Sequence, residues 1–103
     1  MSEDPFIWLQ RFFLSNCDGA WEHEFGCKID TMSDPGWVLR FDLTGTSYEA
    51  RSLEKLEDRR APLDWLKCKV SDGVFEGQCS PRRLGELIEL LRDFVEGRRG
   101  TPA

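Results

Sequence analysis

Apolar and polar residues alternate along two segments of the first half of the chain, residues 21–31 and 37–43. Such alternation is typical of strands that bury one face. The two segments predict a hairpin, and their apolar sides coincide when Thr31 pairs with Trp37. That register leaves residues 32–36, which contain a Pro-Gly pair suited to turns, as the loop.

A second hairpin is predicted around Asp72-Gly73, a dipeptide typical of two-residue turns. Residues 63–70 alternate up to this turn, and the resulting register sets Lys69 opposite Glu76 as a cross-strand charge pair. Residues 53–59 are weakly patterned and rich in charge. We therefore expect a short strand there, at an exposed edge of the sheet.

Two amphipathic helices flank the strands. Asp4-Pro5 predicts the start of a helix over residues 5–16, and Ser80-Pro81 predicts the start of a second helix that ends at Gly97. The order helix, strands, helix predicts a two-layer α+β fold. In it, an antiparallel meander of about five strands carries the N-terminal and the C-terminal helix on one face.

The composition agrees with one small domain in a reducing compartment. The 103 residues suit a single domain, and 40% hydrophobic residues are enough for one core. We assign residues 1–97 to this domain and 98–103 to a flexible tail. No stretch resembles a signal peptide or a membrane span, so we expect a cytoplasmic protein without a membrane partner. The four cysteines form no C-x-x-C pair and predict free, partly buried thiols, with a disulfide or a metal site as the alternatives.

Negative charge is concentrated in the first half of the chain. The formal net charge is −5, and residues 1–50 carry nine acidic against three basic side chains. This excess either is an ordinary solvated surface or forms an acidic face that attracts a basic partner. It disfavours nucleic acid as a partner, because phosphates require concentrated Lys and Arg.

One short segment, Glu22-His23-Glu24, has the residue types of acid–base or metal chemistry. On a strand, His23 would point away from both glutamates, so the three side chains would not converge on one substrate atom. We therefore expect His23 in or near the core, and neither a catalytic residue, a bound metal nor a cofactor. The alternative is a small metal-binding or hydrolytic module centred on this segment.

Several motifs together resemble a known family. W-E-H-E-F-G (21–26) is followed by an alternating strand and then by D-P-G-W (34–37). Further on come D-W-L-K-C-K-V (64–70) and D-G-V-F-E-G (72–77). This combination, over nearly the whole chain, is similar to the bacterial immunity protein 53 family of polymorphic toxin systems.

The resemblance implies a cytoplasmic antidote that binds a cognate toxin domain and neutralises it by direct protein–protein occlusion. The acidic first half would suit a basic nuclease as the toxin. A non-catalytic adaptor domain is a further alternative. From charge and expected exposure, the candidate partner-binding residues are Asp18, Trp21, Glu22, Glu24, Asp30, Asp34 and Asp42, with Trp65 as an anchor.

Overall fold

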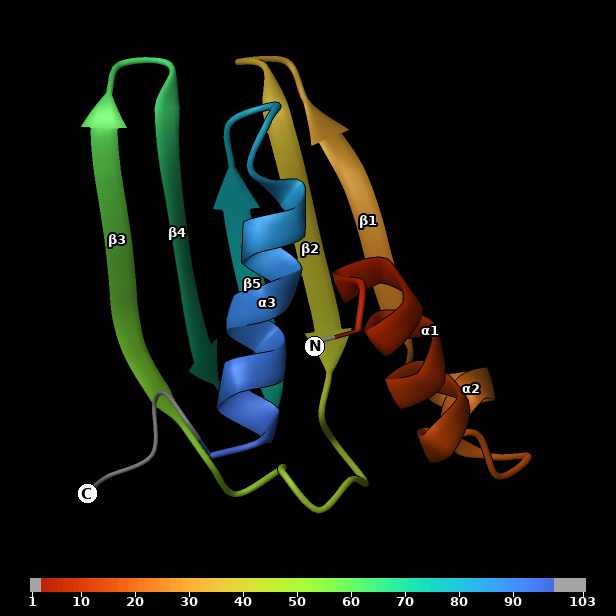
Figure 1. Ribbon diagram of the computed structural model, residues 1–103. Helices are drawn as coiled ribbons and strands as arrows, with labels where there is room; N and C mark the ends of the chain where they lie inside the picture. The colour runs from red at the N-terminus through yellow and green to blue at the C-terminus, as the bar shows by residue number, and fades with distance from the viewer. Residues whose placement is uncertain (1–2, 98–103) are drawn as a thin grey trace.

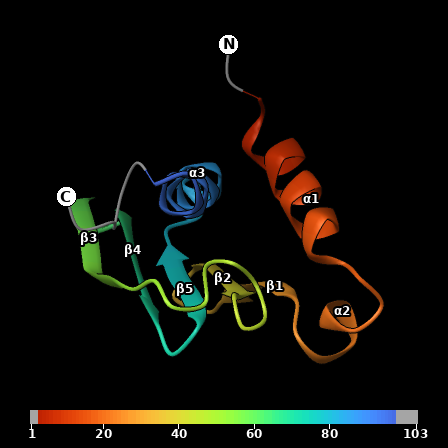
Figure 2. The ribbon, with the colours of Figure 1, turned by 90° about the horizontal axis from the view of Figure 1, so that it is seen from below.

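The chain folds as one antiparallel five-stranded sheet with helices on one face, in a computed structural model that describes residues 3–97 (Figure 1). The elements are α1 (Pro5–Asn16), α2 (Trp21–Glu24), β1 (Cys27–Met32), β2 (Gly36–Asp42), β3 (Leu53–Ala61), β4 (Asp64–Ser71), β5 (Val74–Cys79) and α3 (Leu84–Val95). Viewed from below, α1 and α3 lie on the same side of the sheet (Figure 2). The predicted two-layer α+β fold is confirmed. The predicted tail, residues 98–103, lies outside the described residues.

The strands do not form the predicted meander. Their order across the sheet is β1-β2-β5-β4-β3, so β5 lies between β2 and β4. The connection from β2 to β3 therefore crosses three strand positions, roughly 14 Å at the usual spacing between strands. Residues 43–52, which are mostly polar after the buried Leu43, provide a connection of sufficient length. Alternation within a strand does not specify this order, because it says only which face is buried.

Both predicted hairpins occur in the predicted register. In the first, Thr31 pairs with Trp37, and the pairing extends one step further to Met32 and Gly36, so the loop is shorter than predicted. In the second, Lys69 lies opposite Glu76. Asp72 and Gly73 have φ values of 54° and 77°, which a two-residue turn of this kind requires.

Residues 21–24 form a short helix and not the first part of a strand, so the predicted start of β1 is wrong. The Asp18 carboxylate accepts hydrogen bonds from the backbone N–H groups of Ala20 and Trp21, at 2.9 and 3.0 Å. The Glu22 carboxylate reaches back to the N–H groups of Asp18 and Gly19. Two of these bonds satisfy N–H groups at the helix start, and the other two fix the loop before it, so the segment is helical although its sequence alternates.

The second predicted helix start is also displaced: α3 begins at Leu84 and not at Pro81. Ser80 does not cap the helix, because it continues the ladder between β5 and β4. Its N–H donates to the carbonyl oxygen of Trp65 at 2.9 Å, and its hydroxyl accepts from the Trp65 N–H at 3.2 Å. Strand β3 is longer than predicted, and its register shifts between Leu53 and Leu56.

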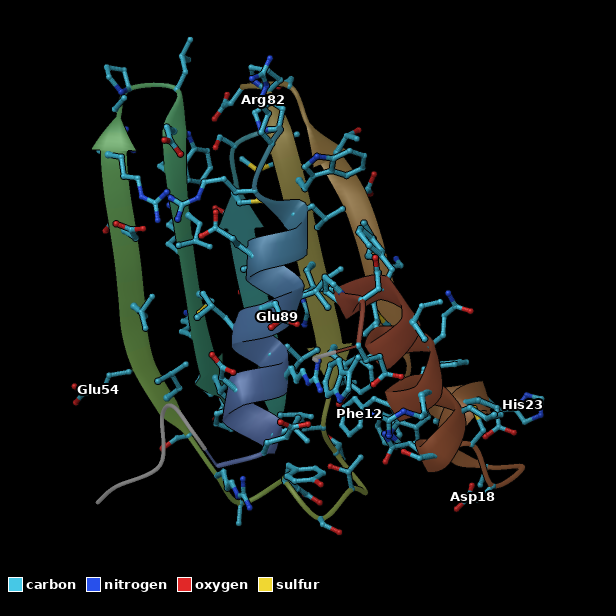
Figure 3. All side chains as sticks on the ribbon, in the orientation of Figure 1. Phe12, Asp18, His23, Glu54, Arg82 and Glu89 are labelled. Atoms are coloured by element: carbon cyan, nitrogen blue, oxygen red, sulfur yellow. The ribbon has the colours of Figure 1, made fainter. Side chains whose placement is uncertain are left out.

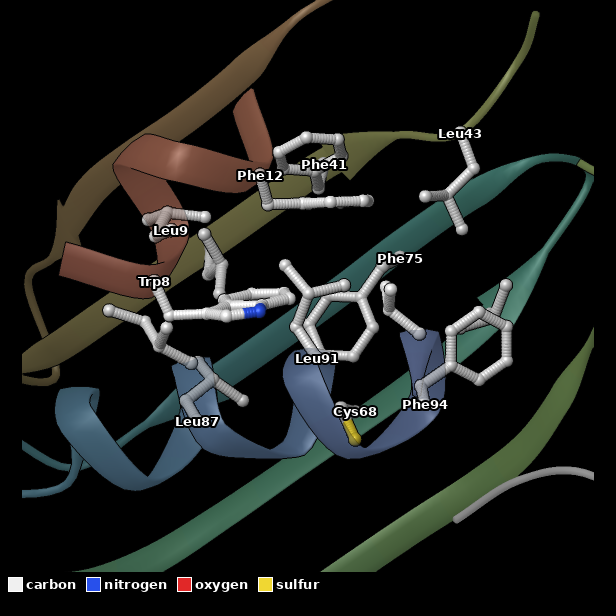
Figure 4. Packing of buried hydrophobic residues seen from close by; sticks show 14 of the residues in the cluster. Trp8, Leu9, Phe12, Phe41, Leu43, Cys68, Phe75, Leu87, Leu91 and Phe94 are labelled. Carbon is white, nitrogen blue, oxygen red and sulfur yellow. The ribbon is translucent and has the colours of Figure 1, made fainter. Parts of the chain in front are cut away.

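The core fills the space between the sheet and the two long helices (Figure 4). Phe12 of α1 stacks on Trp8 at 5.0 Å and contacts Phe41 of β2 at 4.9 Å between ring centroids. Leu87 of α3 lies so close to β5 that a Cβ on Gly77 would approach its Cδ1 to 2.5 Å. The glycine is therefore required for close packing of α3 on the sheet.

Candidate functional site

The face of the sheet that turns away from α1 and α3, called the outer face below, carries no described helix (Figure 2). Strand alternation places mostly polar and charged side chains there, opposite the buried Leu39, Phe41 and Phe75. The pairing aligns Lys28, Arg40, Glu76 and Lys69 in one row across four strands. Arg40 and Glu76 form an ion pair at 3.9 Å. The outer face therefore carries charges of both signs and is not acidic as a whole.

At one end of the sheet, acidic side chains surround α2 and the start of β1. We call this region the acidic corner: Asp18, Glu22, Glu24 and Asp42. Glu22, Glu24 and Asp42 line a shallow hollow of about 450 Å³, which Lys28 and Arg40 also border. Figure 3 shows Asp18 and His23 at the outside of this end.

Most carboxylates of the acidic corner already accept hydrogen bonds from backbone N–H groups. Hydrogen bonds from the N–H groups of Trp21 and Ala20 lower the pKa of Asp18. Backbone N–H groups, first that of Glu22 itself and then those of Asp18 and Gly19, lower the pKa of Glu22. Asp42 accepts a bond from the N–H of Thr44 at 3.1 Å. Glu24 is exposed and makes no such bond, so its charge is the one most available to a partner.

Trp21, predicted as an exposed partner-binding residue, is in the core. Its side chain is 5% exposed, and its ring lies 5.6 Å from both Phe13 and Phe41. Helix α2 turns the ring inward, so its expected exposure is wrong. Asp30 is exposed on β1, Asp34 is exposed in the β1–β2 loop, and Trp65 is half-buried on β4. The predicted residues therefore divide between two ends of the sheet.

His23 is exposed on α2, so its predicted position near the core is wrong. Within residues 3–97, no group of three or more His, Cys, Asp and Glu side chains is placed to hold a metal ion. None of the four cysteines forms a disulfide in the part of the chain that the structure describes. Burial raises the pKa of both Cys27 and Cys79 to about 11, which keeps these thiols protonated at neutral pH.

The opposite end of the sheet contains a cleft of about 890 Å³, which we call the basic notch. It lies between the β1–β2 loop, the β3–β4 loop and the connection from β5 to α3, in the upper part of Figure 1. Its cationic side chains are Arg59, Arg60, Lys67, Arg82 and Arg83, and its acidic ones are Asp34, Asp64 and Glu86. The notch forms because the chain leaves the sheet after Ser80, while the strands on either side of β5 continue into their loops.

One cation of the notch is buried and structural. Arg83 is 3% exposed, and its Nη2 lies 2.7 Å from both Asp58 Oδ2 and Glu86 Oε2. These bonds raise the pKa of Arg83 further and lower the pKa values of both carboxyl groups. Arg60 also pairs with the two carboxylates, at 3.3 and 3.7 Å. The cluster ties the start of α3 to strand β3.

The other cations of the notch lack an acidic partner among the described residues. The guanidinium of Arg59 and the ammonium of Lys67 lie 5.8 and 5.9 Å from the ring centroid of Trp65. Both distances are in the range of cation–π interactions. Arg82, at the rim (Figure 3), makes neither a hydrogen bond nor an ion pair with residues 3–97.

Sequence reasoning identified Trp65 and Asp34 but missed the arginines of the notch. The available signal is a pair of Arg-Arg dipeptides, residues 59–60 and 82–83, each next to a proline-containing turn. Their convergence depends on three loops from distant parts of the chain, which no local pattern reveals.

The fold is that of a small α+β domain whose outer face carries mostly polar and charged side chains. Residues 6–96 match the family model described as Immunity protein 53, and the chain belongs to this family. No curated protein and no solved structure matches the chain significantly. None of the described helices is long and apolar enough to cross a membrane.

Proposed function

We propose that the protein is an immunity protein that binds a cognate bacterial toxin and neutralises it by direct protein–protein occlusion in the cytoplasm. The observation that carries this proposal is the family match over residues 6–96. The structure supports it with an outer face that no described helix covers and with a hollow lined by charged residues at each end of the sheet. Binding and not catalysis is the activity proposed.

Co-expression tests this function. The toxin domain encoded beside this chain should stop bacterial growth on its own, and this chain should restore growth. Occlusion further requires a stable complex, which size-exclusion chromatography of the co-expressed pair should show. Growth arrest that persists while folded immunity protein is present would overturn the proposal for that pair.

A second part of the proposal concerns the toxin, for which we propose a basic nuclease that contacts the acidic corner. A nuclease needs a cationic surface to bind phosphates, and such a surface is attracted to clustered carboxylates. Glu24→Lys should slow association, because rim charges act mainly on the association rate. Glu54→Lys is the matched control, since Glu54 is exposed on β3 at the far edge of the sheet (Figure 3). Equal association rates for the two variants, or an association rate that does not change with salt concentration, would overturn the proposal of a basic nuclease at the acidic corner.

A further inference from the structure

We propose that the basic notch is a second contact site, which takes an acidic segment of the toxin with carboxylates beside Arg59, Lys67 and Arg82. This inference rests on the proposed function and adds a partner chemistry opposite to that of the acidic corner. An apolar side chain of the same segment lies against the ring of Trp65. The notch thereby fixes the orientation of the bound toxin, because the acidic corner and the notch attract toxin surfaces of opposite charge.

The first argument is the division of the cations within the notch. Arg83 and Arg60 are already neutralised by Asp58 and Glu86. Arg59, Lys67 and Arg82 have no carboxylate partner among residues 3–97. An ionised carboxylate from another chain would supply one, and hydrogen bonds between charged groups are stronger than those between neutral groups.

The second argument is the shape and chemistry of the cleft. Its volume of about 890 Å³ lies in the range of sites that enclose a ligand, so it holds several side chains of a partner. Trp65 offers an aromatic surface, and Leu63 in the β3–β4 loop is 78% exposed. Trp and Arg are the residue types that most often dominate binding energies at protein interfaces.

The third argument is that the notch is held in place before a partner binds. Trp65 is fixed through its backbone N–H and carbonyl by Ser80. The indole N–H of Trp37 donates to the carbonyl of Pro81 at 3.0 Å, which joins β2 to the rim. A preformed site loses less conformational entropy on binding than a mobile one.

A protein segment fits the notch better than nucleic acid does. Asp34 borders the cleft and would repel a continuous phosphate backbone, whereas Asp64 and Glu86, which border it too, already pair with Arg83. The net charge of −5 opposes nucleic acid at long range as well. Separate carboxylates on a protein can avoid Asp34 and still reach the free cations.

Dissociation of the purified complex tests the notch separately from the function. The co-expressed complex of toxin domain and immunity protein is mixed with an excess of fluorescently labelled wild-type immunity protein, and exchange is followed over time. Arg82→Glu should speed dissociation by about tenfold or more, as expected for an interface residue that matters. Arg59→Glu should act in the same direction. Lys55→Glu, the same charge change at an exposed position of β3 that borders neither the acidic corner nor the notch, is the matched control.

A zero-length carbodiimide cross-linker tests the acidic chemistry of the partner. The reagent joins an amine to a carboxylate that touches it, so the Lys67 amine should become linked to an Asp or Glu of the toxin. Mass spectrometry identifies the linked peptides. Lys67→Arg keeps the charge and should abolish this link without abolishing binding.

The outcomes separate the two proposals. Failure of the wild-type chain to rescue growth or form a complex overturns the proposed function and the notch with it. If the wild-type chain rescues growth and forms the complex, but both notch variants dissociate at the wild-type rate, the notch proposal alone is overturned. The absence of any cross-link between Lys67 and a toxin carboxylate also overturns it. Binding of a single-stranded oligothymidylate that Arg82→Glu abolishes would overturn the assignment to a protein segment. Arg82 is exposed and makes no hydrogen bond or ion pair with residues 3–97, so the Arg82→Glu variant should stay folded, and a thermal melt checks this.

Discussion

The acidic corner and the basic notch lie at opposite ends of one sheet, yet their charges are used differently. In the corner, Asp18 and Glu22 bind backbone N–H groups and hold α2 in place. In the notch, Arg83 is structural, whereas Arg82 next to it is free among the described residues. The charge of a residue therefore does not say whether it serves the fold or a partner, and neighbouring residues of one type can differ.

The largest effect on stability should come from Trp21, the buried tryptophan beside the acidic corner. Trp21→Ala should lower the free energy of unfolding by about 3–5 kcal/mol, because it leaves a cavity beside Phe41. Trp65→Ala in the notch should cost about 1–2 kcal/mol, since its ring is only half-buried. Urea denaturation measures both. Equal losses would show that the two tryptophans do not differ in role as described.

The next effect separates two adjacent arginines of the notch. Arg83→Ala should lower the free energy of unfolding by about 2–3 kcal/mol, because it removes charged hydrogen bonds from a buried site. Arg82→Ala should change it by less than about 0.5 kcal/mol. The pair is matched in residue type and position along the chain. A similar loss in both variants would contradict the division into structural and free cations.

A smaller effect is expected for the carboxylate that holds the start of α2. Asp18→Ala should lower the melting temperature, because the N–H groups of Ala20 and Trp21 lose their acceptor. Asp18→Asn keeps an acceptor oxygen and should recover part of the loss. Glu24→Ala, on the same helix but without such a bond, should leave the melting temperature unchanged. Thermal unfolding followed by circular dichroism checks the order of the three variants.

The smallest effect is the acid dependence of stability in the notch. The guanidinium of Arg83 lowers the folded pKa values of Asp58 and Glu86 below their ordinary values of 3.8 and 4.5. A lowered folded pKa contributes stability above the ordinary value, and this stability is lost as the pH falls through the folded pKa. Wild type should therefore lose stability below about pH 4.5, and Arg83→Met should show a shallower loss. Identical acid profiles for the two proteins would contradict the coupling.

Features set by strict periodicity or by turn residues could be predicted from the sequence. The register of the first hairpin follows from two apolar faces that must coincide, and that of the second from Asp72-Gly73. Helix α1 starts as predicted, with the Asp4 carboxylate accepting a bond from the N–H of Phe6. In each case, residues close together in the chain determine the result.

Periodicity and turn residues could not predict the features that depend on hydrogen bonds from side chains to backbone groups or on contacts between distant parts of the chain. The bonds of Asp18 and Glu22 hold residues 21–24 as a short helix, although the sequence alternates there. Ser80 looks like a helix cap in sequence but continues a strand ladder with Trp65. The notch needs the strand order to be known, because its three loops meet only when β5 lies between β2 and β4.

The position of β5 also divides the chain into two nearly equal assemblies. The first consists of α1, α2 and the β1–β2 hairpin, and the second of β3, β4, β5 and α3. The pairing of β2 with β5 and the packing of α1 on α3 join them, and residues 43–52 connect them covalently. We expect that two polypeptides cut within this connection would reassemble along that seam. A protein built in this way could be supplied as two inactive pieces that regain its function only when both are made.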